Sequence, residues 1–454
     1  MKFNYKYILP ISLIALAGCS LDDATFEAEE PTQATKDLFA NYVSIGNSLT
    51  AGFTNSGLRH DYQENCFPAQ IARGAGKIAT DNGATTSADE FEIPYINFPG
   101  ISTLGGNTGT TVLVGFTATG SPNIQPGGTY TDPELPGMLN NVALTRPYNN
   151  LGVPGAVAAQ IPLVKFSSDS LAGENPFFDL VLRNNPADTT AKTILEQAIG
   201  LNPSFVSVWL GNNEVLGYAT AGGLNDLDET IAGFNPFNKT LFEQSYTAIW
   251  GALLQANPDL KGFTCTVPKI TNAPFFTTVK PYYTTAENSA IPEGVHVPVW
   301  GKKLLDGTVR MLTEDEFVLL TAASVMATGA GSDSSLALDD QYWLDSDEIA
   351  IIEDYVTAYN ATINTVASAN GIPVFDTNTF LEEFLPENGG KGVLSGIDPL
   401  TTEFISGGIF GLDGVHPNPL GYGLLANELM DMINEKYGTN LQHVNLNKLV
   451  GIVE

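Results

Sequence analysis

Four short apolar runs along the chain predict buried β-strands, because each is bounded by glycine, proline or polar turn residues. They cover residues 42–45, 204–210, 262–268 and 372–376. The first run leads through Gly46 and Asn47 to Ser48, and the segment then breaks at Gly52. The second run ends at residues 211–214, which read Gly-Asn-Asn-Glu. Polar residues therefore follow the carboxyl ends of two predicted strands.

Helical patterns alternate with these strands. A turn at 148–155 leads into a predicted helix over 156–166, and further apolar periodicities predict helices over 241–256 and 419–436. Asp345 and Glu348 form a capping-box pattern for a helix over 346–370, which Gly371 ends. Alternation of strands with helices predicts an α/β fold around a parallel sheet.

Two long segments interrupt this alternation, Thr54–Arg146 and Asn272–Tyr342. Both lack helical periodicity, so they predict insertions made of loops and short strands, of the kind that covers or shapes a site. An acidic cluster spans the end of the second segment and the start of the predicted helix that follows it. A calcium site is one interpretation of this cluster. A helix start beside a solvated loop is the favoured interpretation of its members, Asp339, Asp340, Asp345, Asp347 and Glu348.

Length and charge limit the function classes. The 454 residues are 43% hydrophobic, enough for a substantial core in one large domain or in two or three ordinary ones. The chain carries 20 Lys and Arg against 50 Asp and Glu, a formal net charge of −30. A field of that sign repels phosphate backbones, so no nucleic-acid partner is expected, and solubility is the simplest explanation of the acidity.

The amino terminus has the pattern of an export signal. Lys2 and Lys6 precede an apolar run over 8–17 that is too short for a permanent membrane span, and Gly18 and Cys19 follow. This end resembles a bacterial lipobox, which implies a signal peptide over 1–18 and a lipidated Cys19; an ordinary secretory signal is the alternative. Residues 19–38 then predict a flexible tether. The expected location is the bacterial outer membrane, as a lipoprotein on its periplasmic or outer face.

Two further features stay open at this level. Cys66 and Cys265 could form a disulfide in an oxidising compartment or be two buried thiols, and spacing does not decide between them. The last residues, 441–454, form a carboxyl-terminal extension that could add a strand or dock on the surface.

Ser48 is the candidate nucleophile, and it needs a base and an orienting carboxylate because a serine hydroxyl is weakly nucleophilic at neutral pH. Asp413 and His416 stand three residues apart in a turn bounded by glycine and proline. A short loop can hold the carboxylate against one imidazole nitrogen while the other faces the serine. The remaining histidines are at positions 60, 296 and 443.

Acyl transfer also needs donors that stabilise the developing oxyanion. The backbone amides of Ser48 and Gly155 and the side-chain amide of Asn213 are the candidates; Gly155 has no Cβ to keep substrate away from its backbone. The alternatives are that Gly155 only opens a helix and that Asn213 only caps one.

These segments in this order resemble the four sequence blocks of the SGNH/GDSL hydrolase superfamily: 46–49, 150–155, 211–214 and 413–418. The resemblance implies Ser48 as nucleophile, Gly155 and Asn213 as oxyanion donors, and His416 as base supported by Asp413. It also implies a three-layer α/β/α sandwich around a parallel, flavodoxin-like sheet of about five strands over residues 39–440, with no cofactor or metal required.

Asn47 and Glu214 depart from the superfamily pattern, which usually has aspartate at both positions. The catalytic positions are unchanged. The resemblance implies a serine ester hydrolase acting on lipid acyl esters or on O-acetyl groups of glycans. The alternative is a non-catalytic, glycan-binding surface lipoprotein on the same scaffold.

Overall fold

The computed structural model describes residues 29–78, 91–117, 121–130, 135–171, 173–187, 189–223, 237–285, 289–392 and 399–449. The predicted signal peptide, Cys19 and residues 450–454 lie outside these ranges. All elements named below belong to residues 31–454.

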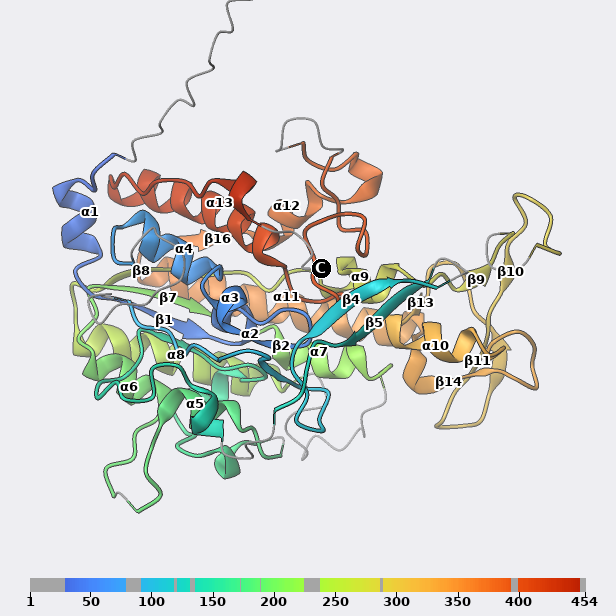
Figure 1. Cartoon of the computed structure of the whole chain (residues 1–454), viewed down its shortest axis with the longest axis horizontal. Helices are drawn as coiled ribbons and strands as arrows, with labels where there is room; N and C mark the ends of the chain where they lie inside the picture. Colours follow the sequence, from blue (N-terminus) through green and yellow to red (C-terminus); the bar gives the residue numbers. More distant parts are fainter. Residues whose placement is uncertain are drawn as a thin grey trace, which may run out of the picture. The chain divides into compact units, whose positions relative to one another are not determined.

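A five-stranded parallel sheet forms the centre of the fold (Figure 1). Its strands lie in the order β16-β8-β7-β1-β6 and pair in parallel throughout. When the five strands are numbered by their position in the chain and read from β6, the order is 2-1-3-4-5. This is the flavodoxin-like order, so the predicted fold class is confirmed. The strands are β1 (Tyr42–Gly46), β6 (Asn150–Gly152), β7 (Phe205–Trp209), β8 (Lys261–Cys265) and β16 (Val374–Phe375).

Successive side chains of a β-strand point to opposite faces of the sheet, so neighbouring residues of the central strands pack in two different hydrophobic clusters. Val43 and Val206 pack on one face of the sheet, and Tyr42 and Phe205 pack on the other. Helices cover both faces, which makes the three layers (Figure 1). The first face is covered by α5 (Phe177–Leu182), α6 (Ile194–Gly200), α7 (Asn213–Thr220), α8 (Lys239–Ala256) and α11 (Ser346–Ala369), and the second by α4 (Phe67–Gly74) and α13 (Pro419–Tyr437).

The longest helices begin and end as their sequences predict. Asp345 accepts a hydrogen bond from the Glu348 N–H at 2.9 Å, and the Glu348 carboxylate accepts one from the Asp345 N–H at 2.8 Å. This capping box opens α11, and Asn418 caps α13 in the same manner through the Gly421 N–H at 3.0 Å. Each cap satisfies a backbone donor that the first helical turn leaves without a partner.

Three local predictions were wrong. The segment Thr54–Arg146 is not wholly irregular, because it contains α3 (His60–Gln63) and α4, and α4 packs against α13 as part of a sandwich layer. Residues 156–166 form only a 3₁₀ turn (Ala158–Gln160), since Pro162 has no N–H to continue an α-helix. Part of the predicted tether is helical: α1 (Gln33–Leu38) is fixed by a hydrogen bond from the Thr35 hydroxyl to Asn440.

The rest of the first insertion, where the structure describes it, consists of loops and short strands, as predicted, with one 3₁₀ turn. The strands are β2 (Gly57–Leu58), β3 (Ile101–Ser102) and the hairpin of β4 (Thr111–Phe116) and β5 (Pro122–Pro126). The short helices α2 (Ser48–Ala51), α9 (Pro274–Thr277), α10 (Ala323–Met326) and α12 (Thr377–Glu382) connect the larger elements.

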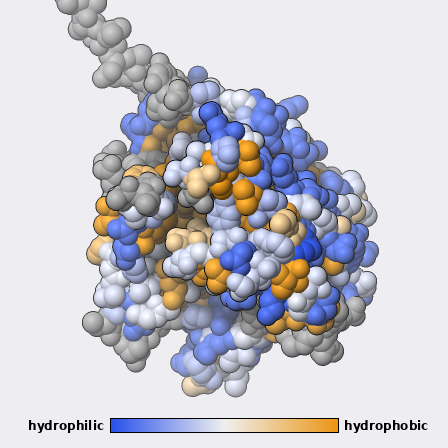
Figure 2. All heavy atoms as spheres, turned by 90° about the vertical axis from the view of Figure 1, so that its right-hand side faces the viewer, coloured by the Kyte–Doolittle hydropathy of each residue, from blue (hydrophilic) through white to orange (hydrophobic). Residues whose placement is uncertain are grey.

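The second insertion has a small hydrophobic cluster of its own around the buried Trp343. Its strands are β9 (Tyr282–Tyr283), β10 (Val297–Pro298), β11 (Trp300–Lys302), β12 (Val309–Met311), β13 (Phe317–Val318), β14 (Leu338–Asp339) and β15 (Trp343–Leu344). Figure 2 views the molecule from the side of this region and shows hydrophobic side chains in separate patches within a mainly hydrophilic surface.

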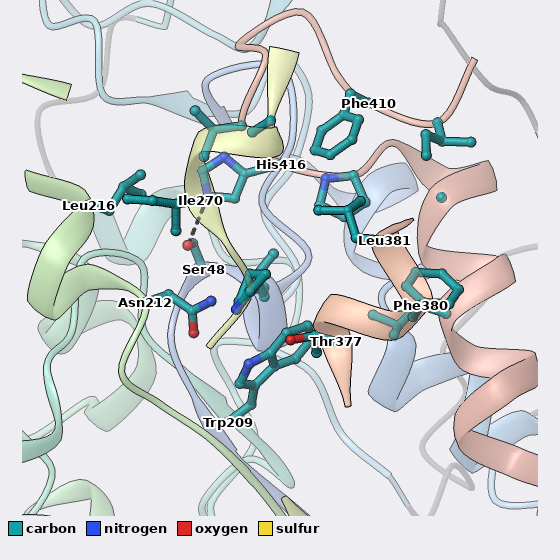
Figure 3. Close-up of a pocket in the computed structure, with 18 of the residues that line it drawn as sticks. Ser48, Trp209, Asn212, Leu216, Ile270, Thr377, Phe380, Leu381, Phe410 and His416 are labelled. Carbon is teal, nitrogen blue, oxygen red and sulfur yellow. Dashed lines mark hydrogen bonds between the residues drawn. The ribbon is translucent and has the colours of Figure 1, made fainter. Parts of the chain in front are cut away.

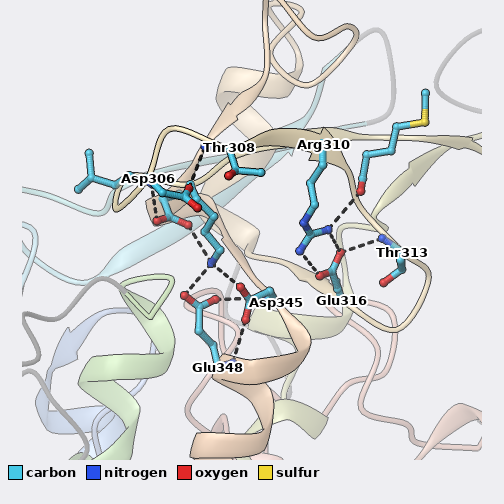
Figure 4. Close-up of polar contacts among 11 residues, drawn as sticks. Asp306, Thr308, Arg310, Thr313, Glu316, Asp345 and Glu348 are labelled. Carbon is cyan, nitrogen blue, oxygen red and sulfur yellow. Dashed lines mark hydrogen bonds and ion pairs between the residues drawn. The ribbon is translucent and has the colours of Figure 1, made fainter.

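The acidic cluster surrounds a lysine of this insertion (Figure 4). The Lys303 ammonium lies 3.0 Å from Asp340, 2.9 Å from Asp345 and 2.7 Å from Glu348. It also lies 4.3 Å above the centre of the Trp343 ring. The side chains of the three acids are only 5–19% exposed. The predicted helix start is therefore confirmed. Asp339 and Asp347 are exposed, as a solvated loop predicts, but Asp340, Asp345 and Glu348 surround a partly buried ammonium instead.

Cys66 and Cys265 are both free and buried, which settles the open choice in favour of two thiols. Burial raises the pKa of Cys66 to about 12.

The carboxyl-terminal extension docks on the helical layer, with Leu441 buried and the Val444 N–H donating to Asn427 of α13 at 2.7 Å. Within the described ranges, the helices are all too short or too polar to cross a bilayer.

Candidate active site

The candidate residues gather where the sheet order reverses. Ser48 follows β1, Gly155 follows β6, and Asn213 follows β7. Strands β1 and β7 are neighbours whose connections run in opposite directions across the sheet. In open α/β sheets the crevice beyond the carboxyl ends at such a switch point is the usual ligand site.

The turn that carries Ser48 is closely packed. The Asn47 carboxamide oxygen accepts a hydrogen bond from the Leu49 N–H at 3.1 Å and so caps α2. A Cβ at Gly46 would clash with the Thr50 side chain and would lie 2.8 Å from the Trp209 carbonyl oxygen. The turn can therefore pass beside β7 only with glycine at this position, and Ser48 is held at the first helical position with 6% exposure.

Ser48, His416 and Asp413 form a connected chain of side chains, and Figure 3 shows the contact between Ser48 and His416. The Ser48 Oγ lies 2.8 Å from His416 Nε2, and His416 Nδ1 lies 3.3 Å from Asp413 Oδ2. A serine, a histidine and a carboxylate in this order have the geometry of a catalytic triad. The structure thus brings together the three residues that the sequence analysis singled out.

Backbone donors fix the Asp413 carboxylate. One oxygen accepts from the N–H groups of Val415 and His416 at 2.9 and 2.8 Å, and the other accepts from the Ser56 N–H at 2.9 Å. Burial of the carboxyl acts to raise its pKa, but the His416 charge and these hydrogen bonds outweigh burial and lower the pKa of Asp413. Asp413 therefore stays ionised and can orient the imidazole.

The sequence analysis missed the residues that support this loop. The Phe53 ring centre lies 4.7 Å from that of His416, and the Asn55 side-chain oxygen accepts from the Leu412 N–H at 2.7 Å. Asn55 and Ser56 both have positive φ, at 51° and 64°. The run Asn55-Ser56-Gly57 is a turn signal that could have located this support, but the predicted insertion began at Thr54.

The oxyanion candidates face the same space as Ser48. Gly155 is exposed with φ of 78°, a backbone conformation that favours glycine. The Asn213 amide donates to the Ala156 carbonyl oxygen at 2.9 Å, and its second hydrogen remains available to a ligand. The first helical turn after Gly155 is the 3₁₀ turn Ala158–Gln160 rather than an α-helix, and Asn212 rather than Asn213 occupies the cap position of α7. The two purely structural alternatives therefore do not describe these residues.

The two departures from the superfamily pattern have local polar contacts. Asn47 donates to the Asn212 side-chain oxygen at 3.3 Å, which joins the turns after β1 and β7. Glu214 is 1% exposed and accepts from the Ala158 N–H at 2.6 Å. Burial raises the pKa of Glu214 to about 7.

Other histidines also pair with carboxylates, which lie further away in sequence than the analysis considered. His296 contacts Glu314 and His443 contacts Asp431, both at 2.8 Å. These pairs are 40–70% exposed, so they are surface ion pairs rather than parts of a buried site. In the part of the chain that the structure describes, no group of three or more His, Cys, Asp or Glu side chains is arranged so that it could hold a metal ion.

Two hollows meet at the triad. One is an apolar cavity of about 110 Å³, shown in Figure 3, and the other is a wide cleft of about 900 Å³. Five residues line both hollows: Ser48, Asn213, Leu216, Val415 and His416. A group bound to Ser48 can therefore extend in two directions.

Comparison with known proteins gives one family. The profile of the GDSL-like lipase/acylhydrolase family matches residues 42–429. This stretch holds Ser48, Gly155, Asn213, Asp413 and His416. A search of curated proteins finds no match.

Similar solved structures are remote. They include an active-site mutant of a family two carbohydrate esterase from Clostridium thermocellum, with 11% identity and a TM-score of 0.32 over 87% of this chain and 64% of that chain. An extracellular lipase from Streptomyces rimosus has 10% identity and a TM-score of 0.32 over 86% and 98%. A peptidoglycan O-acetylesterase has 13% identity and a TM-score of 0.35 over 89% and 96%. Likenesses this weak say nothing about the substrate of this chain, which spans 64% of the length of the carbohydrate esterase.

Proposed function

Because this chain belongs to the GDSL-like lipase/acylhydrolase family of ester-cleaving hydrolases, we propose that it cleaves carboxylic esters through an acyl-Ser48 intermediate. The observation that supports this proposal is the 2.8 Å contact between Ser48 Oγ and His416 Nε2, with Asp413 behind the imidazole.

In the first half of the reaction, His416 Nε2 takes the Ser48 proton as the oxygen attacks the ester carbonyl carbon. The negative charge on the carbonyl oxygen is stabilised by the N–H groups of Ser48 and Gly155 and by the Asn213 amide. The carbon–oxygen bond to the alcohol then breaks, and the imidazolium gives its proton to the leaving alcohol. Asp413 holds the imidazole and stabilises its charged form.

In the second half, His416 takes a proton from water as the water oxygen attacks the acyl carbon. The bond to Ser48 breaks, Ser48 regains a proton from His416, and the carboxylic acid departs. The substrate classes that this chemistry serves are lipid acyl esters and O-acetyl groups on glycans. Neither class needs a metal ion or a cofactor in this scheme.

Fluorophosphonate labelling tests whether Ser48 is activated at all. The purified protein should label on Ser48, and Ser48→Ala should lose the label. A glycan-binding protein that has lost turnover should show no serine-dependent labelling, and that result would contradict the proposal.

The pattern at residues 1–19 supports a further proposal, that Cys19 is lipidated and anchors the protein to the bacterial outer membrane on its periplasmic or outer face. Fatty-acid labelling in bacterial cells checks it. The full-length protein should incorporate label and Cys19→Ala should not; equal labelling of both would contradict the anchor.

A further inference from the structure

The two hollows at Ser48 differ in polarity. The cavity is lined mainly by apolar side chains, which include Ile270, Phe380, Leu381, Phe410, Leu424 and Leu425. The cleft is wider and mixed in character: polar groups such as Ser102, Gln160, Glu174 and Asn175 lie among apolar side chains such as Ile101, Leu104, Phe177 and Phe275. An ester bound at Ser48 has two arms, the acyl chain and the alcohol, and each hollow suits one of them.

Access of water decides which arm enters which hollow. In the second half of the proposed reaction, water attacks from the position that the alcohol has left, with His416 as base. A small pocket lined mainly by apolar side chains offers a water molecule few hydrogen-bond partners, whereas the wider cleft offers room for solvent and polar groups that bind it. Water therefore reaches the acyl carbon from the cleft, so the alcohol departs through the cleft. The acyl chain then occupies the cavity.

Gly155 supports the same orientation. It lines the cleft but not the cavity, as does the neighbouring Pro154. Ser48 and Asn213 line both hollows. A carbonyl oxygen that receives hydrogen bonds from all three donors lies on the cleft side of Ser48, and this leaves the cavity side to the hydrocarbon part of the acyl group.

We propose that the apolar cavity is an acyl pocket that selects fatty acyl chains of intermediate length, and that the wider cleft, where polar and apolar groups are mixed, receives the alcohol. This proposal rests on the ester-hydrolase function proposed above and adds the substrate class. A cavity of about 150 Å³ lined by aliphatic and aromatic side chains holds benzene, with six carbons. A cavity of about 110 Å³ therefore takes roughly four to six carbons.

Leu381 is the residue that best controls the length of this pocket. It belongs to α12, is half-buried, and lines the cavity but not the cleft. Figure 3 shows Phe380 and Leu381 across the cavity from Ser48. Ile270, which is 6% exposed, lies in the segment that follows β8 and also lines the cavity. Larger side chains at either position shorten the space available to the acyl chain.

A series of p-nitrophenyl esters from acetate to hexadecanoate tests the proposal, because only the acyl arm varies. For the wild-type protein, kcat/KM should rise roughly 15-fold from acetate to butanoate, since each buried methylene contributes about fourfold. It should be highest at about four to six carbons and fall for long chains. A decline from acetate onward would overturn the proposal.

Two cavity variants and a matched leucine make the test specific. Leu381→Trp should lower the ratio of hexanoate to acetate activity about 15-fold by excluding roughly two methylenes, and Ile270→Trp should lower it in the same direction. Leu381→Ala should move the optimum to longer chains. Leu104→Trp is the control, because Leu104 is 58% exposed and lines only the cleft; the ratio should not change.

The outcomes separate this inference from the function beneath it. If no ester is hydrolysed in a Ser48-dependent manner and Ser48 does not label, the ester-hydrolase function itself fails. If hydrolysis depends on Ser48 but Leu104→Trp changes the ratio while the folded cavity variants do not, the acyl chain occupies the cleft and only this inference fails. Unfolding midpoints identify which variants are folded, and the two cavity positions give independent readings.

Discussion

The hydroxyl oxygen of Ser48 lies 2.8 Å from His416 Nε2, although 368 positions separate the two residues in the chain. The contact depends on two elements that lie near opposite ends of the sequence, β1 and the loop before α13. β1 delivers Ser48 to the sheet edge, and Asn418 holds the loop before α13 by donating to the carbonyl oxygens of Gly408 and Phe410. The site is therefore assembled only when the whole domain is folded.

Asp413→Asn should lower kcat by about 10³- to 10⁴-fold, because an amide in place of the carboxylate favours the wrong imidazole tautomer and removes the charge that stabilises the imidazolium. The variant should also lose roughly 1–3 kcal/mol of stability if its NH₂ group faces the N–H donors of Val415 and His416. Steady-state kinetics and urea unfolding measure the two effects. A fall in kcat below tenfold would show that Asp413 does not orient His416.

Asn213→Ala should lower kcat by about 10²- to 10³-fold and change KM little, because the amide acts on charge that develops only in the transition state. Asn212→Ala is the matched control: it removes the hydrogen bond from Asn47 but no proposed oxyanion donor. It should reduce kcat far less. Equal losses in both variants would mean that Asn213 acts by holding the turn in place.

Glu214 predicts a pH-dependent stability. Burial raises its pKa to about 7 from an ordinary 4.5, so between these values the folded protein holds a proton that the unfolded chain has lost. The contribution of Glu214 to the free energy of unfolding is therefore fully present below about pH 4.5. It falls as the pH rises from 4.5 to 7, and it is lost above about pH 7. The expected loss is about 3 kcal/mol.

The comparison with Glu214→Gln isolates this effect, because the amide stays neutral at every pH. Relative to the wild type, the variant should gain about 3 kcal/mol between pH 5 and pH 9 in denaturant unfolding. A difference between the two proteins that is the same at both pH values would show that Glu214 is not protonated in the folded state.

Lys303→Met should destabilise the protein by about 3–5 kcal/mol, because it leaves three poorly exposed carboxylates without their shared cation. Lys269→Met is the matched control, since the Lys269–Glu353 pair is about half exposed on both sides. That change should cost about 0–1 kcal/mol. If thermal or chemical unfolding shows the same loss of stability in both variants, the Lys303 cluster does not stabilise the second insertion.

The sequence predicted the parts of the fold that local patterns determine. The apolar runs located β1 and β7, and the capping pattern at Asp345 and Glu348 located the start of α11. The polar turns placed Ser48 and Asn213 at the carboxyl ends of strands, whereas Gly155 was placed only in a turn, because the three-residue strand β6 was not predicted. These features depend on residues that are close in sequence, which is why they are readable without a structure.

The parts that the sequence analysis missed depend on distant contacts. Helix α4 is only 8 residues long and gains its stability by packing on α13. The acidic cluster has a cation at its centre because Lys303, 45 positions before Glu348, reaches into it. The hydrogen bond from Ser56 to Asp413 likewise joins two turns that lie 357 positions apart.

Trapping the acyl-enzyme tests the central claim most directly. The purified protein is mixed with p-nitrophenyl hexanoate, quenched in acid within the first turnovers, and digested for peptide mass spectrometry. The account predicts a hexanoyl adduct on the Ser48 peptide that is absent from Ser48→Ala and that accumulates at most slowly in His416→Ala. Ester hydrolysis at the same rate in Ser48→Ala, or an adduct on any residue other than Ser48, would contradict it.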